Sequence, residues 1–352
     1  MVKLKINIRN LQIVLGFLWL LDGIFQLQPK MFTSAFAHNV IAPAAQGQPG
    51  FVYTLMHFAV HLVLLQPAVF DVLFALIQLS LGALIIYKKT AKFGLMASAI
   101  WAFVVWSLGE GFGGIFSGHT LLLIGAPGAA LLYLLLALAL LPKKDRSNAS
   151  PRYWLVFVWM AIWMGGGIYQ LLPGQNNVGN LGSIISSNSV GAPNWLAALD
   201  THVGKWITGL GHYSVASHPV TVQMAGMSMS APVSAGSSHP GYLLILGLAL
   251  VQLLIGFGVL FPGRWRRVTI LGGSVLALAF WVFGQNLGGF YSATMTDPNS
   301  GPLLMLLGLT ILGISGLDVQ LSQLGKRIGA LLLGGNDDLK QLVVEPMESQ
   351  DV

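Results

Sequence analysis

Long apolar runs recur along this chain at a length that suits a lipid bilayer. A helix rises 1.5 Å per residue, so about 20 apolar residues cross the roughly 30 Å hydrocarbon core. The pattern predicts spans at residues 11–28, 67–87, 94–110, 120–141, 153–172, 241–261, 268–285 and 302–322. The first run holds Asp22 and lacks a small-residue cleavage site, so we do not expect a removed signal peptide. The pattern therefore predicts an all-α polytopic membrane protein with eight transmembrane helices.

The composition agrees with this prediction and excludes several other classes. Of the 352 residues, 55% are hydrophobic and 9% are charged, and the mean hydropathy is +0.72. Soluble domains usually carry about 25% charged residues, so this chain is too poor in charge to cover a soluble surface. The chain has no cysteine, which excludes a disulfide scaffold, thiolate metal sites and cysteine nucleophiles.

The basic residues lie in every second connection between the predicted spans. These connections hold Lys3, Lys5, Arg9, Lys88, Lys89, Lys92, Lys143, Lys144, Arg146, Arg152, Arg264, Arg266, Arg267, Lys326, Arg327 and Lys340. The alternate connections hold Lys30 and Lys205. The positive-inside rule then places both termini in the cytoplasm, in the cell membrane. The net charge of +6 is explained by these loops, so we expect a lipid bilayer and no nucleic acid as partner.

The two halves of the sequence resemble each other. Residues 19–29 match residues 163–173 at an offset of 144, and later the offset becomes 175, which pairs Trp106 with Trp281 and Pro127 with Pro302. Because four spans per half is an even number, both halves enter the membrane in the same direction, as a parallel repeat. The expected units are a first four-helix repeat (1–146), a second repeat (147–325) with an inserted outer loop rich in Met and His (206–240), and a cytoplasmic tail (326–352).

Two further segment pairs accompany the repeat. Phe51–Leu65 and Trp195–Leu210 are expected to form helices at the outer membrane interface. The segments 109–114 and 284–289 are rich in glycine, but no strand precedes them, so they do not fit nucleotide-binding loops. We interpret them as structural turns at helix ends.

Ionisable side chains inside a bilayer are costly, and Asp22 and Glu110 are therefore the candidate catalytic residues. Their repeat partners are Gly166 and Gln285, so the ionisable set belongs to the outer end of the first half. A proton-relay or quinol-binding role is one interpretation. A buried polar network that fixes helix packing is the other.

Four further polar residues could bind a substrate or quinone at the outer face. They are Gln26, His57, His61 and His119. His57 and His61 are four residues apart and share one helix face, which also suits two imidazole ligands on one metal. The alternative is that these histidines lie at headgroup level and bind water or loop atoms.

The inserted loop raises the possibility of copper. His218, Met224, Met227, Met229 and His239 lie in it or at its end, and thioether ligands suit Cu(I). The alternative is a flexible loop or a Met-rich contact surface for a partner.

The segments 23–27 (Gly-Ile-Phe-Gln-Leu) and 167–171 (Gly-Ile-Tyr-Gln-Leu) suggest a family. In a four-span unit with an outer interfacial segment, they resemble the DoxX-like membrane protein superfamily, which includes the small subunit of thiosulfate:quinone oxidoreductase. The resemblance implies a tandem duplication of that unit and a redox-associated role in which quinol or a small substrate binds at the outer face. It assigns no catalytic residue here.

Two other functions remain open from the sequence. One is copper handling, and the other is a structural subunit of a larger complex with other membrane, periplasmic or extracellular subunits. Whether the protein is an enzyme is left open.

Overall fold

The computed structural model describes residues 7–118, 120–142, 152–173, 175–189, 191–210, 220–224, 227–231, 239–314 and scattered positions from 317 to 329. Within these residues the regular structure is helical, apart from one antiparallel hairpin of β1 (Val220–Met224) and β2 (Met227–Ala231). The prediction of an all-α protein is confirmed at this level.

The helices follow one another along the chain with short connections. The α-helices are α1 (Ile8–Gln26), α2 (Ser34–Phe36), α3 (Gly50–Leu65), α4 (Pro67–Ile86), α5 (Ala91–Leu108), α6 (Ala129–Leu140), α7 (Trp154–Gln170), α8 (Val178–Ser187), α9 (Asn194–Gly209), α10 (His239–Gly258), α11 (Arg264–Phe283) and α12 (Ser300–Leu312). Short 3-10 or π turns are η1 (Ala37–Ile41), η2 (Ala42–Ala45), η3 (Phe112–Ser117), η4 (Leu122–Ile124) and η5 (Asn286–Gly289).

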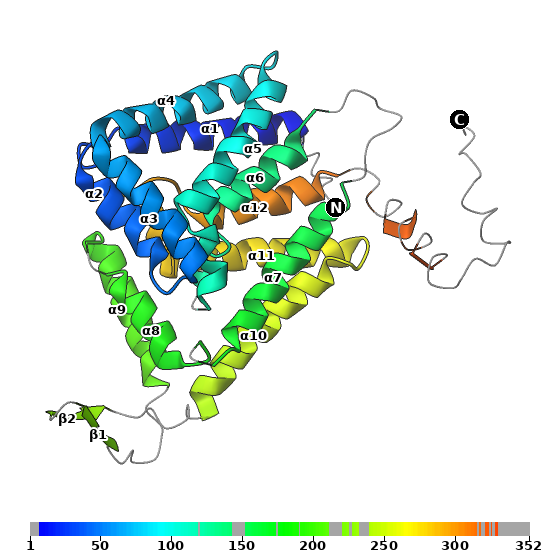
Figure 1. Ribbon diagram of the computed structural model, residues 1–352. Helices are drawn as coiled ribbons and strands as arrows, with labels where there is room; N and C mark the ends of the chain where they lie inside the picture. Colours follow the sequence, from blue (N-terminus) through cyan, green and yellow to red (C-terminus); the bar gives the residue numbers. More distant parts are fainter. Residues whose placement is uncertain are drawn as a thin grey trace.

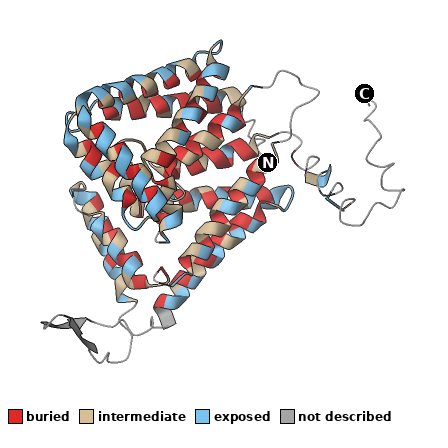
Figure 2. Ribbon diagram, viewed as in Figure 1, coloured by how far each residue is buried: buried red, intermediate tan, exposed pale blue. Residues whose placement is uncertain are grey.

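Five of the described helices are long and apolar enough to cross a membrane. They are α1, α4, α5, α11 and the part of α10 from Gly241 to Gly258. Large apolar side chains on them stay exposed, among them Leu76, Leu254 and Val275 (Figure 2). Such surfaces suit lipid rather than water, because a soluble monomer rarely exposes large contiguous apolar patches.

The expectation of one continuous span over 120–141 is wrong. The helix α6 begins at Ala129, and the residues before it form η4 and irregular turns. Gly125 and Gly128 both have positive φ, and Pro127 lacks a backbone N–H, so this stretch cannot continue a helix. At 12 residues, α6 is about 18 Å long and shorter than the hydrocarbon core.

Two antiparallel helix pairs, α1–α4 and α7–α10, enclose α5, α6, α11 and α12 (Figure 1). The α1–α4 pair and the α7–α10 pair cross through equivalent glycines. A Cβ on Gly23 would lie 2.6 Å from Leu79 Cγ, and a Cβ on Gly167 would lie 3.0 Å from Leu253 Cγ. The same small residue therefore permits the same close approach in both halves.

The connections before α6 and α12 are also equivalent. The indole of Trp106 donates to the carbonyl of Pro127 at 2.9 Å, and the indole of Trp281 donates to that of Pro298 at 2.7 Å. Pro298, rather than Pro302, therefore occupies the position of Pro127. The offset falls from 175 to 171 within this connection, so the second copy is four residues shorter.

Each half places this connection against the other half. Gln28 donates to the carbonyl of Met295, and Gln285 donates to the carbonyl of Leu122, both at 3.3 Å. The hydroxyl of Tyr169 donates to the carbonyl of Ile115 at 2.7 Å. This exchange brings residues 295–299 of the second half to the first half, where they complete a cavity.

Candidate binding cavity

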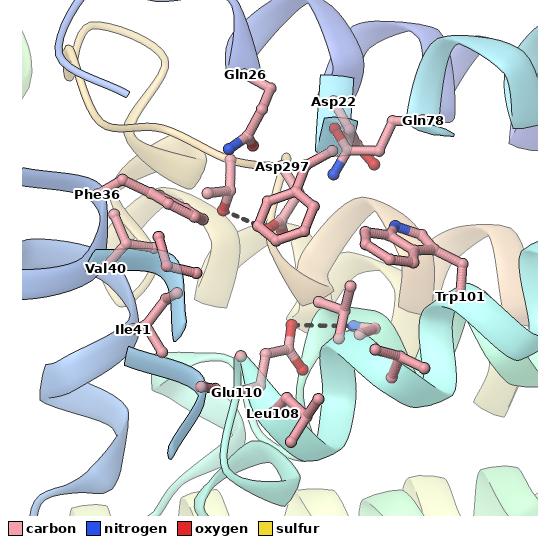
Figure 3. A pocket seen from close by; sticks show the side chains of 18 of the residues that line it. Asp22, Gln26, Phe36, Val40, Ile41, Gln78, Trp101, Leu108, Glu110 and Asp297 are labelled. Carbon is pink, nitrogen blue, oxygen red and sulfur yellow. Dashed lines mark hydrogen bonds between the residues drawn. The ribbon is translucent and has the colours of Figure 1, made fainter. Parts of the chain in front are cut away.

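A cavity of about 270 Å³ lies in the first half, between α1, α3, α4, α5 and α6. The segment Thr296–Asp297, which precedes α12, closes one side of it (Figure 3). Most of its lining is apolar, and the polar side chains come from α1, α4, α5, α6, the residue Glu110 after α5, and the exchanged segment. The cavity is therefore an apolar slot with a polar end.

Aromatic rings form one wall of this slot. The Phe74 ring lies 6.1 Å from both Phe36 and Phe70 and 5.5 Å from Trp101, measured between centroids. All four side chains line the cavity. Rings at these separations pack favourably and keep a rigid apolar surface.

Three carboxyl side chains line this cavity: Asp22, Glu110 and Asp297 (Figure 3). Asp22 lies on α1 on the same face as Trp19 and Gln26, because residues three and four apart share a helix face. Asp22 is 2% exposed, whereas Glu110 and Asp297 keep partial exposure. The hydroxyl of Tyr133 on α6 lies next to Asp22.

Glu110 follows the end of α5 and reaches the first turn of α6. Its Oε1 accepts a hydrogen bond from the backbone N–H of Ala130 at 3.0 Å, while its buried Oε2 has no partner. Gln285 repeats the first contact, because its Oε1 accepts from the N–H of Gly301 at 2.9 Å. Capping the following helix therefore needs a side-chain oxygen at this position, but it does not need a negative charge.

Asp297 is held by its own connection. Its Oδ2 accepts from Thr296 Oγ1 and its Oδ1 accepts from the N–H of Asn299, each at 2.7 Å. At the offset of 171 the corresponding residue of the first half is Ala126. Ala126 and Gly166, the counterpart of Asp22, line a second cavity between the halves, which is also about 270 Å³. Carboxyl groups therefore line the first cavity at positions where the second cavity has Gly166 and Ala126.

Several buried polar atoms at the cavity have no hydrogen-bond partner. Three are acceptors, namely Asp22 Oδ1, Gln78 Oε1 and Glu110 Oε2, and one is an obligate donor, Trp101 Nε1. The Tyr133 hydroxyl, which can act in either role, also makes no bond of normal geometry. Buried polar atoms usually find partners. When the carboxyl groups are ionised, acceptors outnumber donors, and in that state the cavity is complementary to a head group that donates hydrogen bonds.

Burial, together with the nearby charge of Asp297, raises the pKa of Glu110 to about 8, although hydrogen bonds from the Ala130 and Ala129 N–H groups act to lower it. Burial likewise raises the pKa of Asp297, against the bonds from Thr296 and Asn299. No lysine, arginine or histidine is found among the described residues that line the cavity. These carboxyl groups therefore have no basic partner in the described lining.

The structure brings together part of the predicted site. Asp22, Gln26 and Glu110 all line the cavity. The Gln26 amide is already engaged, because its Nε2 donates to Asp71 Oδ1 at 2.6 Å. This bond holds the Gln26 side chain in place and uses one of its N–H donors.

The predicted histidines lie elsewhere. His57 and His61 share one face of α3, as expected, but both are exposed and neither lines the cavity. The His57 ring stacks on Tyr53 with 5.9 Å between centroids. The face of α3 toward the cavity carries Ala59 and Val63. His119 lies outside the described residues.

The structure also gives no support to the predicted metal sites. Among the described residues, no group of three or more His, Asp or Glu side chains could hold a metal ion. The candidate copper ligands His218, Met224, Met227, Met229 and His239 lie outside the side chains that the structure describes.

Sequence reasoning missed Asp297, Gln78, Trp101 and Tyr133. The expectation that the ionisable set lies wholly in the first half is wrong for Asp297, because the exchange of connections carries it across. One signal was present: Asp297 directly precedes a proline at the start of the last apolar run, and its counterpart Ala126 is neutral. Pairing the prolines at the wrong offset concealed this.

No protein-family model, curated protein or solved structure matches the chain.

Proposed function

We propose that this protein is an integral membrane protein that binds a lipophilic small molecule with a hydrogen-bond-donating head group in the first-half cavity. The observation that carries the proposal is the excess of unpartnered acceptors at the end of an aromatic slot. Ligand pockets are typically apolar with a few placed polar groups. A quinol, which carries two O–H donors, is the head group that the DoxX-like resemblance favours.

The proposed topology is eight membrane crossings as two parallel four-helix repeats, 1–146 and 147–325, with both termini in the cytoplasm of the cell. The matched glycine crossings, the matched Trp–Pro bonds and the Glu110–Gln285 capping pair support it. In this proposal the irregular residues 120–128 complete the crossing that α6 is too short to make. Helical breaks are tolerated at membrane depth where protein covers the backbone. Outer partner subunits remain a prediction.

Thermal unfolding of the purified protein in detergent tests ligand binding. Two lipophilic probes with donor head groups, decylhydroquinone and 4-phenylbutylammonium, are added separately. We expect at least one to raise Tm, because a ligand that binds the folded state stabilises it by mass action. Leu62→Trp, which fills the cavity from α3, is expected to abolish the shift.

Leu65→Trp is the matched control. Leu65 ends the same helix, is 61% exposed and does not line the cavity, so this variant is expected to keep the shift. The proposal fails if neither probe raises Tm, or if Leu62→Trp and Leu65→Trp respond alike.

A further inference from the structure

The charges of the cavity are unbalanced. Asp297 lies close enough to act electrostatically on both Asp22 and Glu110, and no basic side chain is found in the described lining. Carboxylates in an apolar surrounding are stable when they are protonated or when a cation neutralises them. The cavity can therefore hold protons or a positively charged ligand.

The fold itself does not require these carboxyl groups. At the equivalent positions of the other copy the residues are Gly166, Gln285 and, for Asp297, Ala126 of the first half, and the equivalent helix pairs cross in the same way. Gln285 keeps the helix cap that Glu110 makes and uses its amide to donate to Leu122. The three acids are thus an addition to a scaffold whose equivalent positions lack them.

Two independent features point these acids at a ligand. The first is that Asp22 lines the cavity and is only 2% exposed, and its Oδ1 has no hydrogen-bond partner. The second is the aromatic wall, which lines the same cavity and consists of Phe36, Phe70, Phe74 and Trp101. Aromatic faces attract cations, and the attraction grows when water is excluded.

We propose that the cavity prefers a lipophilic cation, an ammonium group carried on an apolar body, to a neutral molecule of the same shape. The ammonium group lies between Asp22, Glu110 and Asp297, and the apolar body lies along the aromatic wall. This inference rests on the proposed function and specifies its ligand class. A neutral quinol is the competing outcome of the test.

Binding of the cation displaces a proton from the acidic cluster. The titratable groups around the cation are Asp22 from α1, Glu110 after α5, Tyr133 from α6 and Asp297 before α12. The helix α4 contributes Gln78 to the lining and Asp71 behind Gln26, while α3 contributes no titratable group. One proton leaves for each charge that enters, and no redox step takes part.

The experiment compares the affinity of 4-phenylbutylammonium with that of 4-phenylbutan-1-ol, its neutral counterpart, for the full chain in detergent. We expect the ammonium probe to bind at least tenfold more tightly. Its affinity is also expected to rise with pH between about 6 and 8, by up to about tenfold per pH unit, the limit for one displaced proton. The probe stays charged throughout, because an alkylammonium group has a pKa of about 10.4.

Three variants link this preference to the cavity. Glu110→Gln and Asp297→Asn are each expected to reduce the ratio of the two affinities to near one. Asp200→Asn is the control, because Asp200 is a buried carboxyl group that does not line the cavity.

Equal affinity for the ammonium and the alcohol, or an equal loss in Asp200→Asn, overturns the inference. If decylhydroquinone binds and the ammonium probe does not, the inference fails while the proposed function survives. If no probe binds, both fail.

Discussion

At the scale of single residues, comparing Glu110 with Gln285 shows which part of the glutamate side chain the fold needs. Both side chains use Oε1 to accept from the second backbone N–H of the following helix. The remaining atom differs: the Gln285 amide donates to Leu122, while Glu110 Oε2 has no partner. The cap of α6 therefore does not need the carboxyl group at residue 110, and we expect a glutamine there to retain this cap.

Glu110 contributes to the pH dependence of stability. Its pKa rises from 4.5 to about 8 on folding, so between these values the folded state keeps a proton that the unfolded state has lost. Unfolding then releases a proton, and this stabilising contribution is lost as pH rises through the folded pKa. The slope is at most about 1.4 kcal/mol per pH unit, and partial exposure makes it smaller.

Thermal unfolding in detergent between about pH 5 and pH 8 measures this effect. We expect the Tm of the native chain to fall across the range and Glu110→Gln to show a shallower slope. A Glu110→Gln slope as steep as that of the native chain would assign the effect to other groups.

At the scale of elements, small residues decide where helices can touch. A Cβ on Gly82 would lie 2.6 Å from the backbone oxygen of Gly16, which cannot move aside without shifting α1. In contrast, Gly272 on α11 has open space around it and is exposed. The same residue type is therefore tightly packed at position 82 and unpacked at position 272.

Alanine at these two positions tests the helix crossing. We expect Gly82→Ala to lower the free energy of unfolding by about 1–3 kcal/mol, because it overpacks the α1–α4 contact. Gly272→Ala is expected to be neutral or to stabilise by about 0.5–1 kcal/mol, since alanine is favoured over glycine in a helix. Denaturant titration followed by tryptophan fluorescence gives both values, and similar losses would contradict the packing.

The sequence predicted these elements well where apolar runs are unbroken. The spans expected at 67–87 and 268–285 correspond to α4 (Pro67–Ile86) and α11 (Arg264–Phe283). It failed at 120–141, because leucines and alanines flank a turn whose geometry depends on Gly125, Pro127 and Gly128. Hydrophobicity reports burial, but it does not report a local break in the helix.

At the scale of the whole molecule, the halves are joined by exchanged connections. Asp22 and Glu110 could be selected from the sequence because they interrupt apolar runs. Asp297 could not, because its approach to the first half depends on tertiary contacts such as Gln28 with Met295. His57 and His61 were placed on the correct helix face, but which face looks into the cavity is also a tertiary property.

The topology has its own test, because the chain has no cysteine and single cysteines can be introduced. Lys89→Cys, between α4 and α5, is expected to react with a membrane-impermeant thiol reagent from the cytoplasmic side. Ser183→Cys, exposed on α8, is expected to react from the opposite side. Labelling of both from one side would contradict the parallel repeat.

The most direct test of the central claim, a ligand cavity headed by acids from both halves, is protection of a cysteine placed inside it. Leu108→Cys lines the cavity beside Glu110 (Figure 3), and Ser183→Cys lies away from it. We expect 4-phenylbutylammonium to slow thiol modification at residue 108 several-fold and to leave residue 183 unchanged, with protection lost when Asp297→Asn is added. Modification of Leu108→Cys at the same rate with and without every lipophilic probe would contradict the account.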